Sequence, residues 1–198
     1  GIKARLFRIS FSGELAYELA VPARYGDALI RLLMDIGQPL GITPYGTEAL
    51  GVMRIEKGHP AGNELNGQTS AHHLGMGRML NPNKDFIGKV MAMRPELTRE
   101  DGVRLVGLKP VDPNHAISAG AHIVAIGAAT TSANDQGWVS SVAWSPMMQT
   151  SIALGFVTSG NTRYGEVVRA ADPLRGNDVE VEIVSPHFFD PEGRRLHG

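Results

Sequence analysis

The sequence contains no cysteine among its 198 residues. This absence excludes disulfide bonds, thiolate metal sites and a cysteine nucleophile. No apolar run approaches the roughly 18 residues that indicate a membrane-spanning helix. No basic segment followed by an apolar core marks a secretory leader at the front. The formal net charge of −1 lacks the basic excess that nucleic-acid-binding proteins usually carry.

What the sequence does contain is the composition of a globular protein, with 42% apolar and 20% charged residues. A chain of 198 residues is long enough for one large domain or two small ones. Its first residue is glycine, and a strand pattern begins immediately at Ile2, without the loose leader expected at a free terminus. We therefore expect this chain to be a segment of a longer protein.

The first part of the chain mixes strand and helix signals. Alternating apolar residues predict two strands that flank a turn at 12–14, and Pro22 ends the second strand. Apolar residues at helical spacing then predict two helices, with Gly37 and Gly58 as their stops. The predicted order is strand, strand, helix, strand, helix, over residues 2–12, 17–21, 25–37, 40–42 and 47–58.

The middle of the chain is predicted to be mostly loop. Residues 58–70, GHPAGNELNGQTS, are typical of a long ordered loop, and such loops tend to be functional. A helical patch over 71–80 and a short helix over 87–93 follow. Residues 95–102, PELTREDG, are polar and bounded by Pro and Gly, which makes them the best candidate for a linker between domains.

Beyond Gly102 the pattern changes to short strands rich in Val, Ile and Ala. Turn residues separate these strands at intervals typical of an all-β barrel or sandwich. The predicted strands cover residues 104–108, 122–126, 139–143, 151–157, 166–170 and 179–184.

Most motifs with known chemistry are missing. The seven histidines show no HxxxH or HxH spacing, so no metal site is predicted. Gly75-Met76-Gly77 is too short for a dinucleotide fingerprint. Ser140 and Ser141 have no obvious base partner, which argues against a nucleophile. Arg54 and Glu56 fall within a predicted helix, where a structural ion pair or a solvated face is the default interpretation.

Glu18 is the most informative residue, because it places a carboxylate inside a strand pattern. Burying a carboxylate costs several kcal/mol unless it is paired. Glu18 therefore indicates either a solvated strand face or a ligand that presents hydrogen-bond donors. Glu14, in the turn, is interpreted as solvated. Trp138 and Trp144 bracket a predicted strand and are typical of core or barrel-rim packing.

Five segments together resemble the aminomethyltransferase family, which includes the glycine-cleavage T-protein. Residues 11–18, FSGELAYE, are similar to its signature aromatic-(S/T)-G-E-x-G-(F/Y)-E, with Ala16 in place of the usual Gly. The other segments occur in the family's order and extend the resemblance over nearly the whole chain: 52–58, 84–89, 105–108, and 139–146 with 151–156. Within the family, residues 44–59 and 185–193 look most like the α subunits of heterotetrameric sarcosine oxidases.

The resemblance implies a fold of class α+β. It places the C-terminal half of a folate-binding α+β domain over residues 1–100 and a small all-β barrel domain of the aminomethyltransferase type over residues 101–198. The change from a mixed to an all-strand pattern near residue 100 agrees with this division.

The resemblance also implies a chemistry. Enzymes of the sarcosine oxidase type oxidise sarcosine at a flavin, and the resulting imine passes to tetrahydrofolate, giving glycine and 5,10-methylenetetrahydrofolate. This region is expected to bind tetrahydrofolate, whereas flavin and NAD are expected elsewhere in the complex. The implied partners are folate and the other subunits of a heterotetramer, with no nucleic acid and no membrane, and the implied location is the cytoplasm.

Three residues are implied as folate-binding. Glu18 matches the family's pterin-binding glutamate, and a carboxylate can accept two hydrogen bonds from the pterin's donor edge. Phe11 stands where relatives often have a ring-contacting Tyr, and it keeps the aromatic face. Arg54 matches the second Arg of the family's helix. Leu50 and Gly51 replace an Arg-Asp pair of the family, which predicts that folate is bound differently or more weakly.

No catalytic residue is assigned to this segment, because the family's key aspartate lies in the half that precedes residue 1. The isolated chain is therefore predicted to be inactive. Two other interpretations stay open. One is a fragment of a stand-alone aminomethyltransferase or of a dimethylglycine oxidase-like enzyme. The other is a non-catalytic assembly module whose folate site has decayed.

Overall fold

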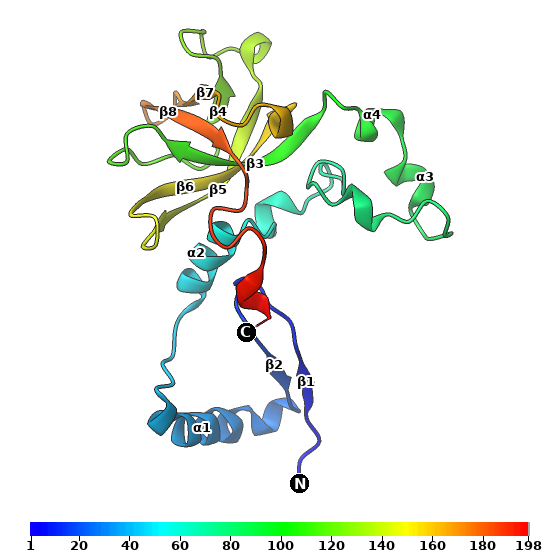
Figure 1. The fold of residues 1–198 in the computed structure, drawn as a ribbon, viewed down its shortest axis with the longest axis vertical. Coiled ribbons are helices and arrows are strands. Elements are labelled where there is room, and N and C mark those ends of the chain that lie inside the picture. Colours follow the sequence, from blue (N-terminus) through cyan, green and yellow to red (C-terminus); the bar gives the residue numbers. More distant parts are fainter. Residues whose placement is uncertain (198) are drawn as a thin grey trace.

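The computed structural model describes residues 1–197 and shows two unlike parts (Figure 1). A closed barrel of six strands lies at one end, and a more open arrangement of a hairpin and helices extends away from it. The predicted class, α+β with a small all-β barrel, is confirmed. Gly198, the last residue of the second predicted domain, lies outside the described residues.

The barrel contains all six strands that the sequence predicts. They close in the order β3-β6-β5-β4-β7-β8, and each neighbouring pair is antiparallel. Side chains such as Leu108, Ile123 and Leu154 are fully buried in its core. The strands are β3 Val103–Pro110, β4 His122–Val124, β5 Gly137–Ser145, β6 Thr150–Thr158, β7 Val167–Asp172 and β8 Asn177–Val184.

The preceding part contains a two-stranded hairpin and four helices. Strand β1, Arg5–Phe7, pairs antiparallel with β2, Glu18–Ala20, and places Phe7 opposite Glu18. The helices are α1 Gly26–Gly37, α2 Thr47–Lys57, α3 Lys89–Ala92 and α4 Pro95–Thr98, the last within the predicted linker. None of the helices within residues 1–197 is long and apolar enough to span a bilayer.

The predicted strand at Leu40–Ile42 is wrong. Residues Gln38–Leu40 form a 3-10 turn directly after α1, and Gly41 follows with φ +79°. The turn brings Ile42 back to α1, where its N–H donates to the carbonyl of Gly37 at 3.0 Å. The apolar triplet favours a strand locally, but no strand among residues 1–197 pairs with it.

Helix α2 is the element that connects the two parts, because it packs against β5 and β6 of the barrel. It ends at Gly58, whose φ of +74° permits its N–H to bond back to the last turn. The N–H of His59 also bonds back, to the carbonyl of Arg54 at 2.8 Å. This ending directs residues 59–64 from the helix toward the barrel wall.

Candidate functional site

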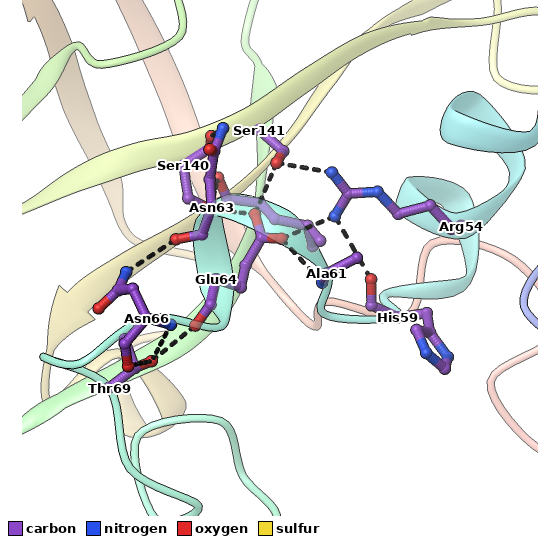
Figure 2. A network of polar contacts seen from close by, with 10 residues as sticks. Arg54, His59, Ala61, Asn63, Glu64, Asn66, Thr69, Ser140 and Ser141 are labelled. Atoms are coloured by element: carbon purple, nitrogen blue, oxygen red, sulfur yellow. Dashed lines mark hydrogen bonds and ion pairs between the residues drawn. The ribbon is translucent and has the colours of Figure 1, made fainter. Parts of the chain in front are cut away.

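A buried ion pair joins α2 to the barrel (Figure 2). Arg54 lies on α2, and Glu64 lies in a 3-10 turn, Gly62–Glu64, within the long loop. Their Nη1 and Oε2 atoms are 2.8 Å apart, with 12% of the Arg54 side chain and none of the Glu64 side chain exposed. A carboxylate buried this completely requires a full set of donors, because an unpaired buried charge is very costly.

Each oxygen of Glu64 has two donors. Oε1 accepts hydrogen bonds from the hydroxyls of Ser140 and Ser141, both at 2.6 Å. Oε2 accepts from Arg54 and, at 3.0 Å, from the backbone N–H of Ala61. Burial raises the pKa of Glu64, but the two serines, the Ala61 N–H and Arg54 outweigh it and lower the pKa below its usual range. Glu64 is therefore charged at neutral pH.

Two adjacent serines reach one carboxylate because strand β5 is irregular at this point. Successive side chains of a regular strand point to opposite faces. The pairing of β5 with β6 shifts register between Val139 and Ser141, which leaves Ser140 as an extra residue. Such a bulge re-aims a side chain, so both hydroxyls face Glu64 (Figure 2).

Arg54 also contacts the barrel and the beginning of the 58–70 loop. Its Nη2 donates to Ser141 Oγ at 2.7 Å, and its Nη1 donates to the carbonyl of His59 at 3.4 Å. The ring of His59 meets Phe11 edge-on, with ring centroids 4.9 Å apart. Burial, and then the neighbouring charge of Arg54, lower the pKa of His59, so that its neutral form is favoured. A continuous series of contacts thus links Phe11 to the barrel.

The structure brings two of the three predicted folate-binding residues into this network. Phe11 is half-buried against His59, and Arg54 is at the centre of the ion pair. Glu18 is separate from them: it is exposed on β2, and its side chain forms no hydrogen bond or ion pair with other groups of residues 1–197. Residues directly opposite in an antiparallel pair share a face, so Glu18 lies beside Phe7, which is 42% exposed.

A groove of about 770 Å³ lies between α2 and β5, and Arg54 lines it. Trp144 forms part of its wall and is 55% exposed, so the prediction that this residue packs in the core or rim is wrong. Trp138 does pack as predicted, with its ring centroid 5.0 Å from that of Phe156. Within residues 1–197, no cluster of three or more His, Asp or Glu side chains is arranged to hold a metal ion.

Sequence reasoning missed the buried carboxylate at the centre of the network. Glu64 belongs to a polar loop, where a glutamate is ordinarily solvated. The sequence shows no partner near Ser140 and Ser141, because their partner is Glu64, which lies 76 positions before Ser140. Glu56, expected to be solvated or ion-paired, is instead 6% exposed and accepts a hydrogen bond from Ser145 at 2.6 Å. The signal in the sequence that could have indicated this site is the long polar loop, residues 58–70.

The α+β part and the barrel each match a domain of one protein family. The model of the GCVT N-terminal domain matches residues 1–84, and that of the glycine cleavage T-protein C-terminal barrel domain matches residues 104–190. The chain therefore belongs to the glycine-cleavage T-protein family.

Among curated relatives, sarcosine oxidase subunit alpha of Rhizobium meliloti is 49% identical over 97% of this chain, and that of Corynebacterium sp. strain P-1 is 40% identical over 100%. An aminomethyltransferase of Saccharopolyspora erythraea is 31% identical over 96% of the chain. The chain spans only 20% and 21% of the two alpha subunits, and 50% of the aminomethyltransferase.

A solved structure shows the same fold. The glycine cleavage system aminomethyltransferase T from Bartonella henselae superposes with a TM-score of 0.79 at 23% identity. The match covers 95% of this chain and 50% of that one.

Proposed function

We propose that this chain is the tetrahydrofolate-binding segment of a sarcosine oxidase α subunit, which supports oxidative demethylation of sarcosine to glycine with one-carbon transfer to tetrahydrofolate. The observation that carries the proposal is the 49% identity with a sarcosine oxidase subunit alpha over 97% of this chain. Flavin and NAD, with the oxidation itself, are assigned to other regions and subunits of a soluble, cytoplasmic complex.

The fit of a pterin to this chain depends on Glu18. Both of its carboxylate oxygens are available, because the Glu18 side chain is exposed and forms no hydrogen bond within residues 1–197. A pterin carries its 2-amino group and ring N–H on one edge, and a carboxylate can accept from both. Phe7 offers an aromatic surface on the same face of the hairpin as Glu18. Tetrahydrofolate, when bound, supplies the nitrogens that accept the one-carbon unit.

Phe11 and Arg54 have different roles in this proposal. Phe11 presents an aromatic face from a loop that His59 holds in place. Arg54 donates to Glu64, Ser141 and the carbonyl of His59, so most of its hydrogen-bonding capacity is already used. We therefore propose that Arg54 supports the folate site mainly by fixing residues 59–64, and contacts folate only along the groove that it lines.

The test uses the full-length protein with its partner subunits. In Glu18→Gln the charged acceptor is lost, and hydrogen bonds to a charged group contribute about 1.5–3 kcal/mol, so tetrahydrofolate should bind about tenfold more weakly or worse. Isothermal titration calorimetry measures the affinity. Product analysis during sarcosine oxidation should show more formaldehyde and less 5,10-methylenetetrahydrofolate. The matched control is Glu180→Gln, an exposed glutamate on β8 of the barrel.

The same measurements separate the other interpretations. One-carbon transfer from an aminomethyl carrier without amine oxidation would support an aminomethyltransferase, for which the 31% identical relative gives a basis. Oxidation of dimethylglycine in preference to sarcosine would support a dimethylglycine oxidase-like enzyme. If tetrahydrofolate does not bind, the result would support a non-catalytic assembly module. The isolated chain, which lacks any assigned catalytic residue, is expected to show no methylene transfer.

A further inference from the structure

The C-terminal strap, residues 185–197, returns from the end of the barrel to α2 and to the loop after β1 (Figure 1, red). Its first contacts are with the end of α2. His187 Nδ1 lies 2.8 Å from the carbonyl oxygen of Lys57, and the N–H of Phe189 donates to the carbonyl of Glu56 at 3.1 Å. Gly58 fits closely here, since a Cβ at that position would lie 2.3 Å from the carbonyl oxygen of Pro186.

Asp190 turns the strap and holds Lys57. Its φ is +46°, a conformation that L-residues adopt infrequently. Its carboxylate accepts hydrogen bonds from the N–H groups of Arg194 and Arg195, each at 3.0 Å. The ammonium of Lys57 donates to the Asp190 carbonyl at 2.6 Å and lies 3.5 Å from Oδ2. Only 15% of the Lys57 side chain and 10% of the Asp190 side chain are exposed.

The stem of Lys57 in turn supports the loop that contains Phe11. Gly13 is buried and has φ +86°. A Cβ on Gly13 would lie 2.6 Å from both Cγ and Cδ of Lys57, so the backbone of this loop rests directly on the lysine stem. The N–H of Gly13 also donates to Ser10 Oγ at 2.9 Å, which closes the loop around Phe11.

We propose that Asp190 is a positioning residue for the 10–14 loop. Its carboxylate fixes the turn that presents its own carbonyl to Lys57, and the stem of Lys57 holds Gly13 and so sets the place of Phe11. The inference rests on the proposed function, because it assigns a purpose to the position of Phe11. It differs from that proposal in the residues it names, since Asp190 and Lys57 are not among the proposed folate-binding residues Glu18, Phe11 and Arg54.

A second connection between strap and loop is weaker. Arg195 Nη1 lies 3.0 Å from Glu14 Oε1, but 52% and 42% of the two side chains are exposed. Water and salt screen such pairs, and most of them contribute little. The buried Lys57–Asp190 contact is therefore the one expected to decide where the loop lies.

The test compares two acidic residues of the strap in the full-length protein. Asp190→Ala should weaken tetrahydrofolate binding about tenfold, raising the KM for folate with little change in kcat, because Phe11 contributes to binding. Glu192→Ala is the control, since within residues 1–197 the Glu192 side chain pairs only with the exposed Arg194. The affinity of this variant for tetrahydrofolate should stay within twofold of that of the unaltered protein. If Asp190→Ala does not fold, Asp190→Asn replaces it, because Asn tolerates the positive φ while it lacks the charge and one of the two acceptor oxygens.

Two measurements keep the inference separate from the proposed function. Hydrogen exchange of the Gly13 amide needs no ligand and should quicken in Asp190→Ala but not in Glu192→Ala. Asp190→Ala keeps the carbonyl that accepts from Lys57 but removes the carboxylate that fixes the turn. Its effect and that of Lys57→Met should overlap rather than add, because both loosen the hold on the Lys57 stem. Unchanged exchange at Gly13, or fully additive effects on it, would overturn the inference. Failure of the unaltered protein to bind tetrahydrofolate would overturn the proposed function alone.

Discussion

The barrel and the hairpin–α1 region bury their apolar residues very differently. In the barrel, side chains such as Phe156 and Ile183 are 0% exposed. In α1, Ile30, Leu32 and Ile36 are 54–60% exposed, and Leu6 on β1 is 65% exposed. An amphipathic helix is stable mainly through packing of its apolar face. The barrel therefore has the contacts to be stable by itself, whereas the hairpin and α1 present apolar surface that a further part of the protein is suited to cover.

The largest expected difference between the two regions is in the cost of truncating an apolar residue. Phe156→Ala removes a fully buried ring from the barrel and should cost about 3–5 kcal/mol of unfolding free energy. Ile36→Ala changes a side chain that is 60% exposed and should stay within about 0.5 kcal/mol. Urea unfolding followed by tryptophan fluorescence measures both. Similar losses would contradict the comparison, because α1 would then be as well packed as the barrel.

The link between the regions should be sensitive to loss of its buried carboxylate. Glu64→Ala leaves Arg54 without its negatively charged partner in a nearly closed site and should destabilise the chain by about 3 kcal/mol. Replacing both residues, as in Glu64→Leu with Arg54→Met, should recover part of that loss, because no unpaired charge then stays buried. Urea unfolding of the two variants is the measurement. A double variant less stable than Glu64→Ala would show that the pair itself stabilises the link.

A smaller effect is expected from acid. The pKa of Glu64 is lower in the folded chain than its ordinary value of about 4.3. Its charged form therefore stabilises the fold at neutral pH, and this contribution is lost as the pH falls below about 4.3 and through the folded-state pKa. The difference in unfolding free energy between the unaltered chain and Glu64→Gln should be constant from pH 8 to 5 and narrow below that. A difference that widened on acidification would contradict the assignment.

The sequence was most informative about the barrel and least informative about the link. All six barrel strands follow from short runs rich in Val, Ile and Ala between turn residues, because such runs favour strands and the turns separate them. The strand expected at 40–42 is wrong, because the turn at 38–40 brings Ile42 back to α1. Glu64 could not be recognised, since burial of a loop glutamate depends on donors that lie far away in the sequence.

The structure connects some of the predicted folate-binding residues but not all of them. Phe11 and Arg54 were singled out from the resemblance, and the structure connects them through His59. The same resemblance implies Glu18, which is exposed on β2 and separate from Phe11 and Arg54. Its role in binding folate is a proposal.

The amino-acid sequence by itself determined the order of most elements, the six strands of the second part and membership of the T-protein family, because periodicity and short motifs are local properties. Only the tertiary structure decided which polar groups meet. The bulge in β5, the left-handed turns at Gly58 and Asp190, and the return of the C-terminal strap bring together charges that lie up to 181 residues apart in the chain. A buried charge is tolerated only where partners converge on it, and that convergence is a property of the folded chain.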